Sequence, residues 1–244
     1  MKLYGLIGFP LEHSFSKDYF TKKFEREQFS NCLFQNFPLQ DLAAFPDLLR
    51  MHRDLQGLAV TIPYKEQILD FTDAASDEVL EIGAANCLQI VEGICTAHNT
   101  DIIGFRESLH RFLGKQPLPA LILGTGGASK AVEYVLRKEQ VPLLRVSRQP
   151  NPGSITYADI DSGILKDFPL VVNCTPLGMY PNTETAPPIP YAELTPENRL
   201  FDLIYNPAPT QFLHYGAAAG CPVQNGLEML EIQAEANWAI WNKG

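Results

Sequence analysis

A cluster of glycines between two apolar runs carries the strongest chemical signal. Gly124, Gly126 and Gly127 follow the apolar run of residues 118–123, and apolar residues at helical spacing come next. In such a strand–turn–helix unit the first glycine permits the tight turn, and the second lets the backbone approach a pyrophosphate. Free N–H groups at the helix start then face the anion. Ser129 stands where a strict G-x-G-x-x-G motif has its third glycine, so a plain strand-to-helix connection stays the alternative.

The next predicted strand, residues 141–146, indicates which nucleotide would bind. NAD-binding units usually have an acid near this strand end, where it accepts hydrogen bonds from the adenosine ribose. Here the strand ends in Ser147 and Arg148, and the next acid is Asp159. A hydroxyl and a guanidinium can donate to a 2′-phosphate, so the ending favours NADP over NAD. The alternative is that Arg148 is an ordinary surface charge.

Lys65 and Asp101 are candidates for acid–base chemistry. Lys65 follows an apolar strand predicted over residues 57–62, and ligands bind α/β proteins at the carboxyl ends of such strands. The alternative is a solvated lysine that starts the next helix. Asp101 stands where a helix through residues 105–112 begins, so it is also explained as a helix cap.

Two serines precede the first predicted helix, residues 17–27. Ser16 lies directly before it and is a natural N-cap. Ser14 and Ser16 could instead turn their hydroxyls toward an anion at the same helix start. The spacing alone leaves both interpretations open.

Alternating strands and helices predict an α/β protein with largely parallel sheets. The glycine unit starts a second βαβ block after a complete first one, so we expect the chain to divide near residue 102. The last predicted helix, residues 227–241, carries an apolar stripe with Gln233 beside it. A buried amide there needs partners, from the backbone or from a ligand.

Composition restricts the function further. The chain has 244 residues, 45% of them hydrophobic and 19% charged, with a net charge of −9. This charge argues against nucleic-acid partners and anionic membrane surfaces. No apolar run approaches 18 residues, so neither a membrane span nor a signal peptide is predicted. The five cysteines are scattered, which favours reduced thiols in a cytoplasm. The five histidines are scattered as well, so no metal site is predicted.

With these residues placed, the chain resembles the shikimate dehydrogenases over nearly its whole length. The resemblance rests on separated motifs in a fixed order, and the order is far more specific than any one of them. The motifs are HSFS at 13–16, VTIPYK at 60–65, AAN at 84–86, NTD at 99–101, GTGGAS at 124–129, VSR at 146–148, NCTPLGM at 173–179 and NGLEML at 225–230, followed by Gln233.

The resemblance implies an activity and a domain plan. The family reduces 3-dehydroshikimate to shikimate reversibly with NADPH, in the biosynthesis of chorismate and the aromatic amino acids. It implies an α/β substrate domain over residues 1–102, completed by a C-terminal helix at 226–244. A Rossmann-like, doubly wound NADP domain would cover residues 103–225, with a cleft between the two. The expected partners are small molecules only, in a cytoplasmic monomer or homodimer.

The resemblance also assigns roles to residues. Lys65 would supply the proton for the carbonyl oxygen, with Asp101 beside it. The substrate would contact Ser14, Ser16, Thr61, Lys65, Asn86, Asp101, Tyr205 and Gln233. NADP would contact Gly124, Thr125, Gly126, Gly127, Ala128, Ser129, Ser147, Arg148, Thr175, Met179 and Gly226.

One position departs from the family pattern. Similar chains usually have Asn where Ala59 stands, two residues before Thr61. Alanine removes a polar partner of the substrate, which costs roughly 1–3 kcal/mol if a hydroxyl is left unpaired. Two alternatives to the biosynthetic enzyme stay open. One is a quinate/shikimate dehydrogenase of broader specificity, and the other is an NADP-binding regulator without catalysis.

Overall fold

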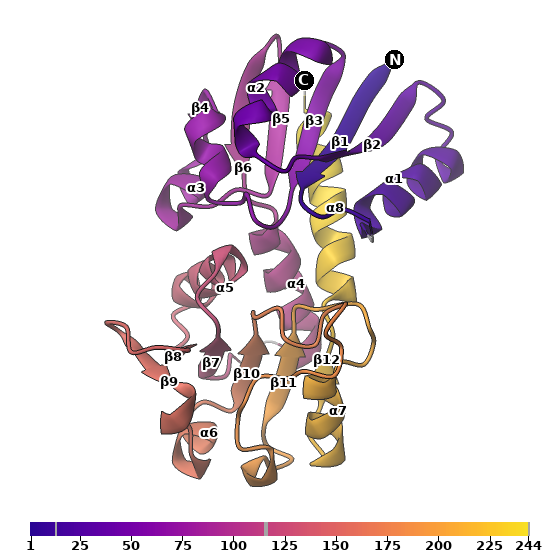
Figure 1. The fold of residues 1–244 in the computed structure, drawn as a ribbon. Coiled ribbons are helices and arrows are strands. Elements are labelled where there is room, and N and C mark those ends of the chain that lie inside the picture. The colour runs from indigo at the N-terminus through magenta and orange to yellow at the C-terminus, as the bar shows by residue number, and fades with distance from the viewer. Residues whose placement is uncertain (13, 115–116, 244) are drawn as a thin grey trace. The chain divides into compact units, whose positions relative to one another are not determined.

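The chain forms two compact units in a computed structural model that describes residues 1–12, 14–114 and 117–243. The first unit consists of Met1–Thr100 and Gln233–Gly244, and the second of Asp101–Ile232. His13 of the HSFS motif and Gly244, the last residue of the predicted C-terminal segment, lie outside the described residues. Helix α8, Leu227–Trp241, contributes residues to both units (Figure 1).

The first unit is built on a mixed six-stranded sheet in the order β2-β1-β3-β5-β6-β4. Strand β1 pairs in parallel with both β2 and β3, whereas β5 is antiparallel to its neighbours β3 and β6. The carboxyl ends of β1, β2 and β3 therefore meet at one edge of the sheet. The strands are β1 Lys2–Gly8, β2 Cys32–Pro38, β3 Leu55–Val60, β4 Ala74–Ala75, β5 Cys87–Val91 and β6 Ile94–His98.

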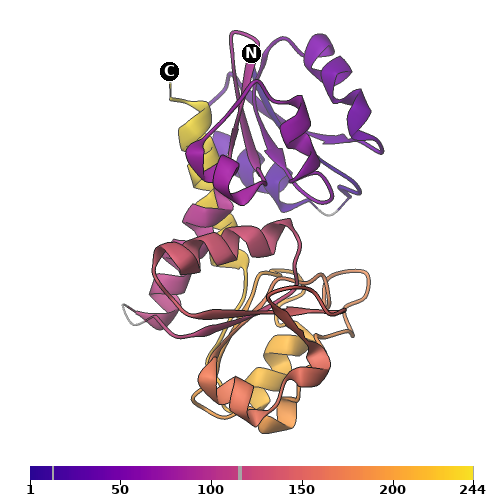
Figure 2. The ribbon, with the colours of Figure 1, turned by 90° about the vertical axis from the view of Figure 1, so that its left-hand side faces the viewer.

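Helices cover both faces of this sheet (Figure 2). On one face, α2 (Phe45–Met51), α3 (Asp77–Ile82) and the 3-10 turns Leu42–Ala44 and Gln67–Phe71 pack on Leu58. On the other face, α1 (Phe15–Arg26) and the second part of α8 pack on Tyr4. Trp241 of α8 lies so close to the sheet that a Cβ at Gly57 would be 2.2 Å from its ring. Glycine is therefore required at that point of β3.

The second unit has a six-stranded sheet in the order β12-β11-β10-β7-β8-β9, and every pairing in it is parallel. This is the strand order of the doubly wound dinucleotide-binding fold, which switches direction between its first and fourth strands, here β7 and β10. The predicted Rossmann-like fold is confirmed. The strands are β7 Ala120–Leu123, β8 Leu143–Ser147, β9 Ser154–Thr156, β10 Leu170–Asn173, β11 Arg199–Asp202 and β12 Val223–Gln224.

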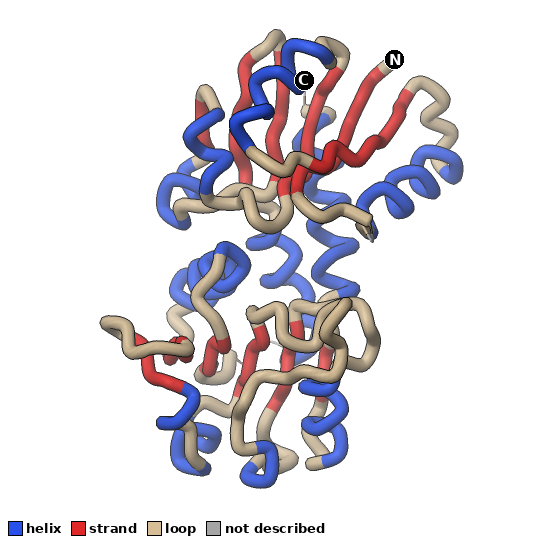
Figure 3. Tube along the Cα trace, in the orientation of Figure 1, coloured by secondary structure: helices blue, strands red, loops and turns tan. Residues whose placement is uncertain are grey.

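Helices lie on both faces of this sheet as well (Figure 3). Phe105 of α4 (Asp101–Leu113) meets Phe201 of β11 edge-on, with ring centroids 5.3 Å apart, and α5 (Gly127–Lys138) packs beside α4. On the opposite face, Leu165 of α6 (Ser162–Asp167) and Phe212 of α7 (Gln211–Ala218) join one apolar cluster. Two 3-10 turns, Tyr157–Asp159 and Tyr191–Glu193, complete the unit.

Several predicted element boundaries were wrong. Helix α1 begins at Phe15, so Ser16 lies inside its first turn and Ser14 holds the N-cap position without a side-chain cap bond. The sequence also suggests a helix over residues 73–81, whereas α3 begins only at Asp77, because the Ser76 hydroxyl caps it. Asp101 is the first residue of α4 and not its cap. The three-residue strand β9 was not predicted, since its short polar segment carries no apolar run.

Candidate functional site

In the first unit, the predicted substrate residues gather at the carboxyl ends of β1 and β3. Thr61 donates its N–H to the carbonyl of Ile7, 2.9 Å away, which fixes the start of the loop that carries Lys65. The Lys65 carbonyl accepts the N–H of Ala85 at 2.7 Å, and Val60 donates to the carbonyl of Asn86 at 2.8 Å. These backbone bonds hold the Lys65 loop against the segment that carries Asn86. The structure thus brings together three predicted residues that lie up to 25 positions apart.

A buried network of uncharged side chains continues from Asn86. Its amide donates to the Gln233 oxygen at 3.4 Å, and its own oxygen accepts the Thr100 N–H at 2.6 Å. The Thr100 hydroxyl contacts Asn237 at 2.6 Å. Sequence reasoning named Asn86 and Gln233 but missed Thr100 and Asn237. Asn237 follows Gln233 by four residues on α8, and this spacing was the signal that could have found it.

Ser14 and Ser16 sit where the loop after β1 enters α1. Ser16 is only 9% exposed. The Ser14 hydroxyl oxygen is buried and has no hydrogen-bond partner within the described residues. A buried hydroxyl without a partner is costly, so a ligand that accepts or donates there would remove the penalty. This observation favours the predicted anion contact over simple helix capping.

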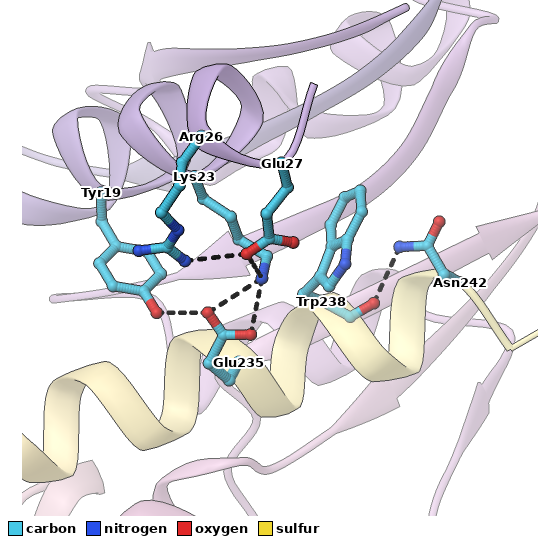
Figure 4. A network of polar contacts seen from close by, with 7 residues as sticks. All are labelled: Tyr19, Lys23, Arg26, Glu27, Glu235, Trp238 and Asn242. Atoms are coloured by element: carbon cyan, nitrogen blue, oxygen red, sulfur yellow. Dashed lines mark hydrogen bonds and ion pairs between the residues drawn. The ribbon is translucent and has the colours of Figure 1, made fainter. Parts of the chain in front are cut away.

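An ion-pair cluster joins α1 to α8 (Figure 4). Lys23 of α1 is 4% exposed, and its ammonium lies 2.8 Å from Glu235 of α8 and 3.0 Å from Glu27. The Tyr19 hydroxyl also donates to Glu235. A buried ammonium needs such carboxylate partners to offset its lost hydration. The cluster fixes the helix that carries Ser16 against the helix that carries Gln233.

In the second unit, the glycine turn has the geometry of an anion site. Gly124 follows β7 with φ of +108° and donates its N–H to the Val146 carbonyl at 3.0 Å. Gly126 holds the N-cap position of α5, and no side chain caps that helix start. A Cβ built on Gly126 would meet no atom within 4 Å. Neither backbone strain nor protein packing explains this glycine, whereas close approach of a phosphate would.

Other predicted phosphate contacts differ in availability. Ser129 is 1% exposed, and its hydroxyl donates to the Gly126 carbonyl at 2.7 Å. The Ser147 hydroxyl donates to the Gln149 carbonyl and lies 3.3 Å from the Ser154 hydroxyl. Arg148 is exposed and forms no ion pair within the described residues. Of these side chains, Arg148 fits a 2′-phosphate best.

Thr175 and Gly226, predicted on the nicotinamide side, follow β10 and β12. Asn173 accepts both the N–H and the hydroxyl of Thr175, at 3.0 and 2.7 Å. Gly226 donates its N–H to the Ile204 carbonyl at 3.1 Å, and a Cβ on it would lie 2.1 Å from the Leu203 carbonyl oxygen. Close packing therefore requires glycine at 226. Met179, also predicted on this side, lies further along the same loop as Thr175 and is 38% exposed.

Asp202, at the end of β11, is a buried acid that sequence reasoning missed. It is 0% exposed, and burial raises the pKa of its carboxyl to about 6. It lies in the middle of the strand-like run 200–204, whose other residues are apolar, and that context concealed its polar role.

The described residues contain no group of three or more acids, cysteines or histidines that could hold a metal ion, and all five cysteines are free thiols. No described helix is long and apolar enough to cross a membrane.

Comparison with known proteins assigns the chain to a family. Residues 6–88 match the model of the shikimate dehydrogenase substrate binding domain. The NADP(+) shikimate dehydrogenase of Caldicellulosiruptor bescii is 34% identical, with 99% of this chain aligned to 89% of the relative. The chain belongs to the shikimate dehydrogenase family.

Solved structures of relatives agree with this assignment. The shikimate 5-dehydrogenase of Thermus thermophilus, in complex with NADP(H) and shikimate, is 29% identical with a TM-score of 0.89, covering 99% of this chain and 94% of that one. A quinate dehydrogenase from Corynebacterium glutamicum in complex with NAD is 25% identical, with a TM-score of 0.86 and coverage of 99% and 93%. Both substrate classes therefore occur on this fold.

Two features of the site matter for a shikimate dehydrogenase. Ala59 is paired in register with Leu6 and Cys87 and lies in the apolar cluster with Ala234, so its surroundings offer little polar compensation. Asp101 opens the second unit and is 6% exposed, while Lys65 belongs to the first. The pairing of Lys65 with Asp101 stays a prediction, as does the placing of Tyr205, a second-unit residue, with the substrate residues of the first.

Proposed function

We propose that this chain catalyses the reversible, NADP-dependent interconversion of shikimate and 3-dehydroshikimate, in the biosynthesis of chorismate and aromatic amino acids. The observation that carries the proposal is family membership over 99% of the chain together with retention of Lys65 and Asp101. The open Gly126 backbone, the uncapped start of α5 and the exposed Arg148 fit a phosphorylated dinucleotide. When bound, NADPH supplies the hydride that the carbonyl carbon accepts.

Lys65 is the proposed general acid of the reduction. It donates a proton to the former carbonyl oxygen and takes it back during oxidation, so charge balances in both directions. Backbone bonds from Ala85 to Lys65 and from Val60 to Asn86 hold the loop from which the Lys65 side chain would reach the substrate. Asp101 is the proposed second catalytic residue.

Substrate recognition is proposed to use directional side chains. Ser14, Ser16 and Tyr205 would bind the carboxylate, and the unsatisfied Ser14 hydroxyl supports this role. Thr61, Asn86, Asp101 and Gln233 would bind the ring hydroxyls. Because Asn86 and Gln233 are already joined to Thr100, both amides are held in place before the substrate arrives.

Cofactor recognition is proposed to use mainly the backbone. The stretch from Gly124 to Ser129 would cradle the pyrophosphate, with Ser147 and Arg148 at the 2′-phosphate. Thr175, Met179 and Gly226 would flank the nicotinamide. Arg148 is the residue that would distinguish NADP from NAD, since no acid occupies this strand end.

A spectrophotometric assay tests the proposal directly. Reduction of NADP⁺ and of NAD⁺ is followed with shikimate and, separately, with quinate. We expect the highest kcat/KM for NADP⁺ with shikimate. A preference for quinate would favour the broader enzyme, and NADP⁺ binding without turnover on either substrate would favour a regulator.

The assembly and the compartment are proposals as well. We propose a monomer or homodimer in the cytoplasm, which the five free thiols support. Light scattering coupled to size-exclusion chromatography measures the mass directly, and a tetramer would contradict this proposal.

A further inference from the structure

Asp202 occupies an unusual position for an acid. It ends β11 with no exposed surface, next to the turn that leads to Tyr205. Its Oδ1 accepts the amide of Asn173 and the N–H of Ile204, both at 3.0 Å, and its Oδ2 accepts the Thr210 hydroxyl at 2.5 Å. None of its partners in the described part of the chain is a cation. A buried carboxyl held only by neutral donors is energetically costly, so its presence at this position calls for an explanation.

Two of those donors, Asn173 and Ile204, also form hydrogen bonds to residues of the proposed nicotinamide site. Asn173 uses its amide on Asp202 and its oxygen on Thr175, so one side chain joins the acid to the loop after β10. Ile204 uses its N–H on Asp202 and its carbonyl on the N–H of Gly226. Thr175 and Gly226 are both proposed to flank the nicotinamide. Each is two hydrogen bonds away from the same carboxyl.

The remaining oxygen fixes the far end of the β11 loop. Thr210 donates to Asp202 and accepts the N–H of Leu213, which makes it the N-cap of α7. The loop from Leu203 to Pro209 is thus tied to Asp202 at both ends. A Cβ at Gly124 would lie 3.1 Å from the Thr175 side chain, so the glycine turn also abuts a loop that Asp202 holds.

We propose that Asp202 is a positioning residue that sets the geometry of the cofactor site by holding the loops after β10, β11 and β12 in one arrangement. This inference rests on the proposed NADP-dependent function. Asp202 acts through Asn173, Ile204 and Thr210 and does not itself touch the cofactor. Two titratable side chains, Tyr191 and Cys174, interact electrostatically with Asp202. Both are neutral at physiological pH, because burial raises the pKa of each.

The experiment compares three variants by calorimetric titration of NADP⁺ into the purified chain. Asp202→Leu keeps the branched shape of the side chain but removes all three acceptor contacts, and we expect the Kd for NADP⁺ to rise about tenfold or more. Asp202→Asn keeps an acceptor oxygen for Asn173 and Ile204, so we expect it to stay within about threefold of the parent chain. If the position required only a buried side chain of this shape, Asp202→Leu and Asp202→Asn would bind NADP⁺ equally well.

Asn198→Leu is the matched control. Asn198 is 2% exposed, lies just before β11 at the opposite end of the strand, and also joins two segments, through Thr195 and the Leu165 carbonyl. It should lose similar thermal stability without a change in NADP⁺ affinity. If Asp202→Leu does not fold, Asn173→Ala takes its place, because it cuts the link between Asp202 and Thr175, together with a 3.4 Å bond to the Leu177 carbonyl, and leaves the bonds of Asp202 to Ile204 and Thr210.

The outcomes separate the two proposals. A folded Asp202→Leu or Asn173→Ala chain with the parent Kd overturns the positioning role alone. An equal loss of affinity in Asn198→Leu overturns it too, since the effect would then be general loosening. A parent chain that neither binds NADP⁺ nor oxidises shikimate overturns the proposed function, and this inference with it.

Discussion

The two units present their proposed ligand-binding residues in different ways. In the first, side chains at strand ends and on α8 carry the polar groups, and Thr100 joins Asn86 to Asn237 beneath them. In the second, the backbone carries them, at the glycine turn and at the free start of α5. A ring with several hydroxyls needs directional donors and acceptors, whereas a phosphate is satisfied by clustered N–H groups and a helix dipole.

Each unit also contains a buried hydrogen-bond network next to its proposed site, but the two networks differ in chemistry. The Thr100 network contains only hydroxyl and amide groups, which do not titrate. The Asp202 network has a carboxyl at its centre. From this comparison we expect deletion of side chains to impair the site of the first unit. In the second unit we expect added Cβ atoms to weaken cofactor binding, and pH to change stability.

Lys65→Ala is the strongest test on the side-chain unit. Without this proposed general acid the enzyme should lose turnover by roughly two to four orders of magnitude. The KM for NADP⁺ should stay within about twofold, since Lys65 belongs to the first unit and no cofactor contact is proposed for it. Steady-state kinetics with shikimate measures both. Undiminished turnover would remove Lys65 from the mechanism.

The pH dependence of stability should distinguish the two buried networks. Burial raises the pKa of Asp202 from an unfolded value of 3.8 to about 6, so the folded chain keeps this proton where the unfolded chain has lost it. The stabilisation is complete below pH 3.8 and is lost as the pH rises to about 6. Relative to Asp202→Asn, the parent chain should therefore lose roughly 3 kcal/mol of unfolding free energy across that window, at about 1.4 kcal/mol per pH unit.

Urea unfolding at several pH values on both sides of this window measures the difference. Thr100→Val is the control from the other unit, and its loss of stability should be the same at every pH because its partners Asn86, Gln233 and Asn237 carry no titratable group. A flat difference between the parent chain and Asp202→Asn would contradict a raised pKa at Asp202.

Gly124→Ala tests the backbone unit. Gly124 has φ of +108°, where an L side chain is strained by about 1–3 kcal/mol, and its new Cβ would press on Thr175 from 3.1 Å. We expect the KM for NADP⁺ to rise about tenfold, measured at saturating shikimate. Gly93→Ala introduces similar strain at φ of +84° in the β5–β6 hairpin, with no neighbour within 4 Å. It should lower the melting temperature and leave this KM unchanged.

Ala59→Asn introduces the amide that the resemblance to the family leads us to expect at this position, and it should have the smallest effect. If the amide reaches a substrate hydroxyl, the KM for shikimate should fall roughly threefold to tenfold, the worth of one hydrogen bond. Stability should decrease slightly, because Ala59 lies among Leu6, Cys87 and Ala234. Unchanged KM and kcat for shikimate would show that Ala59 does not limit binding.

Much of the fold could be read from local patterns. The run of residues 118–123, the glycines and the helical spacing after them predicted β7, Gly124 and α5, because these features depend on near neighbours in the chain. Residues 73–76 were misread as helix, because the Ser76 cap and the bonds between Asp73 and Cys95 compete with the helical pattern. Thr100 and Asn237 were missed because their partners lie far away in sequence.

The sequence by itself determined the order of elements, the chemistry at the strand ends and the family, since motifs, glycines and apolar periods are written in adjacent residues. Only the tertiary structure decided which polar groups are buried together. Lys23 meets Glu235 across 212 positions, and Asp202 takes Asn173 from the neighbouring strand. Whether a charged group is solvated or buried depends on packing. Packing brings together residues that lie far apart along the chain, and local sequence patterns do not show which ones will meet.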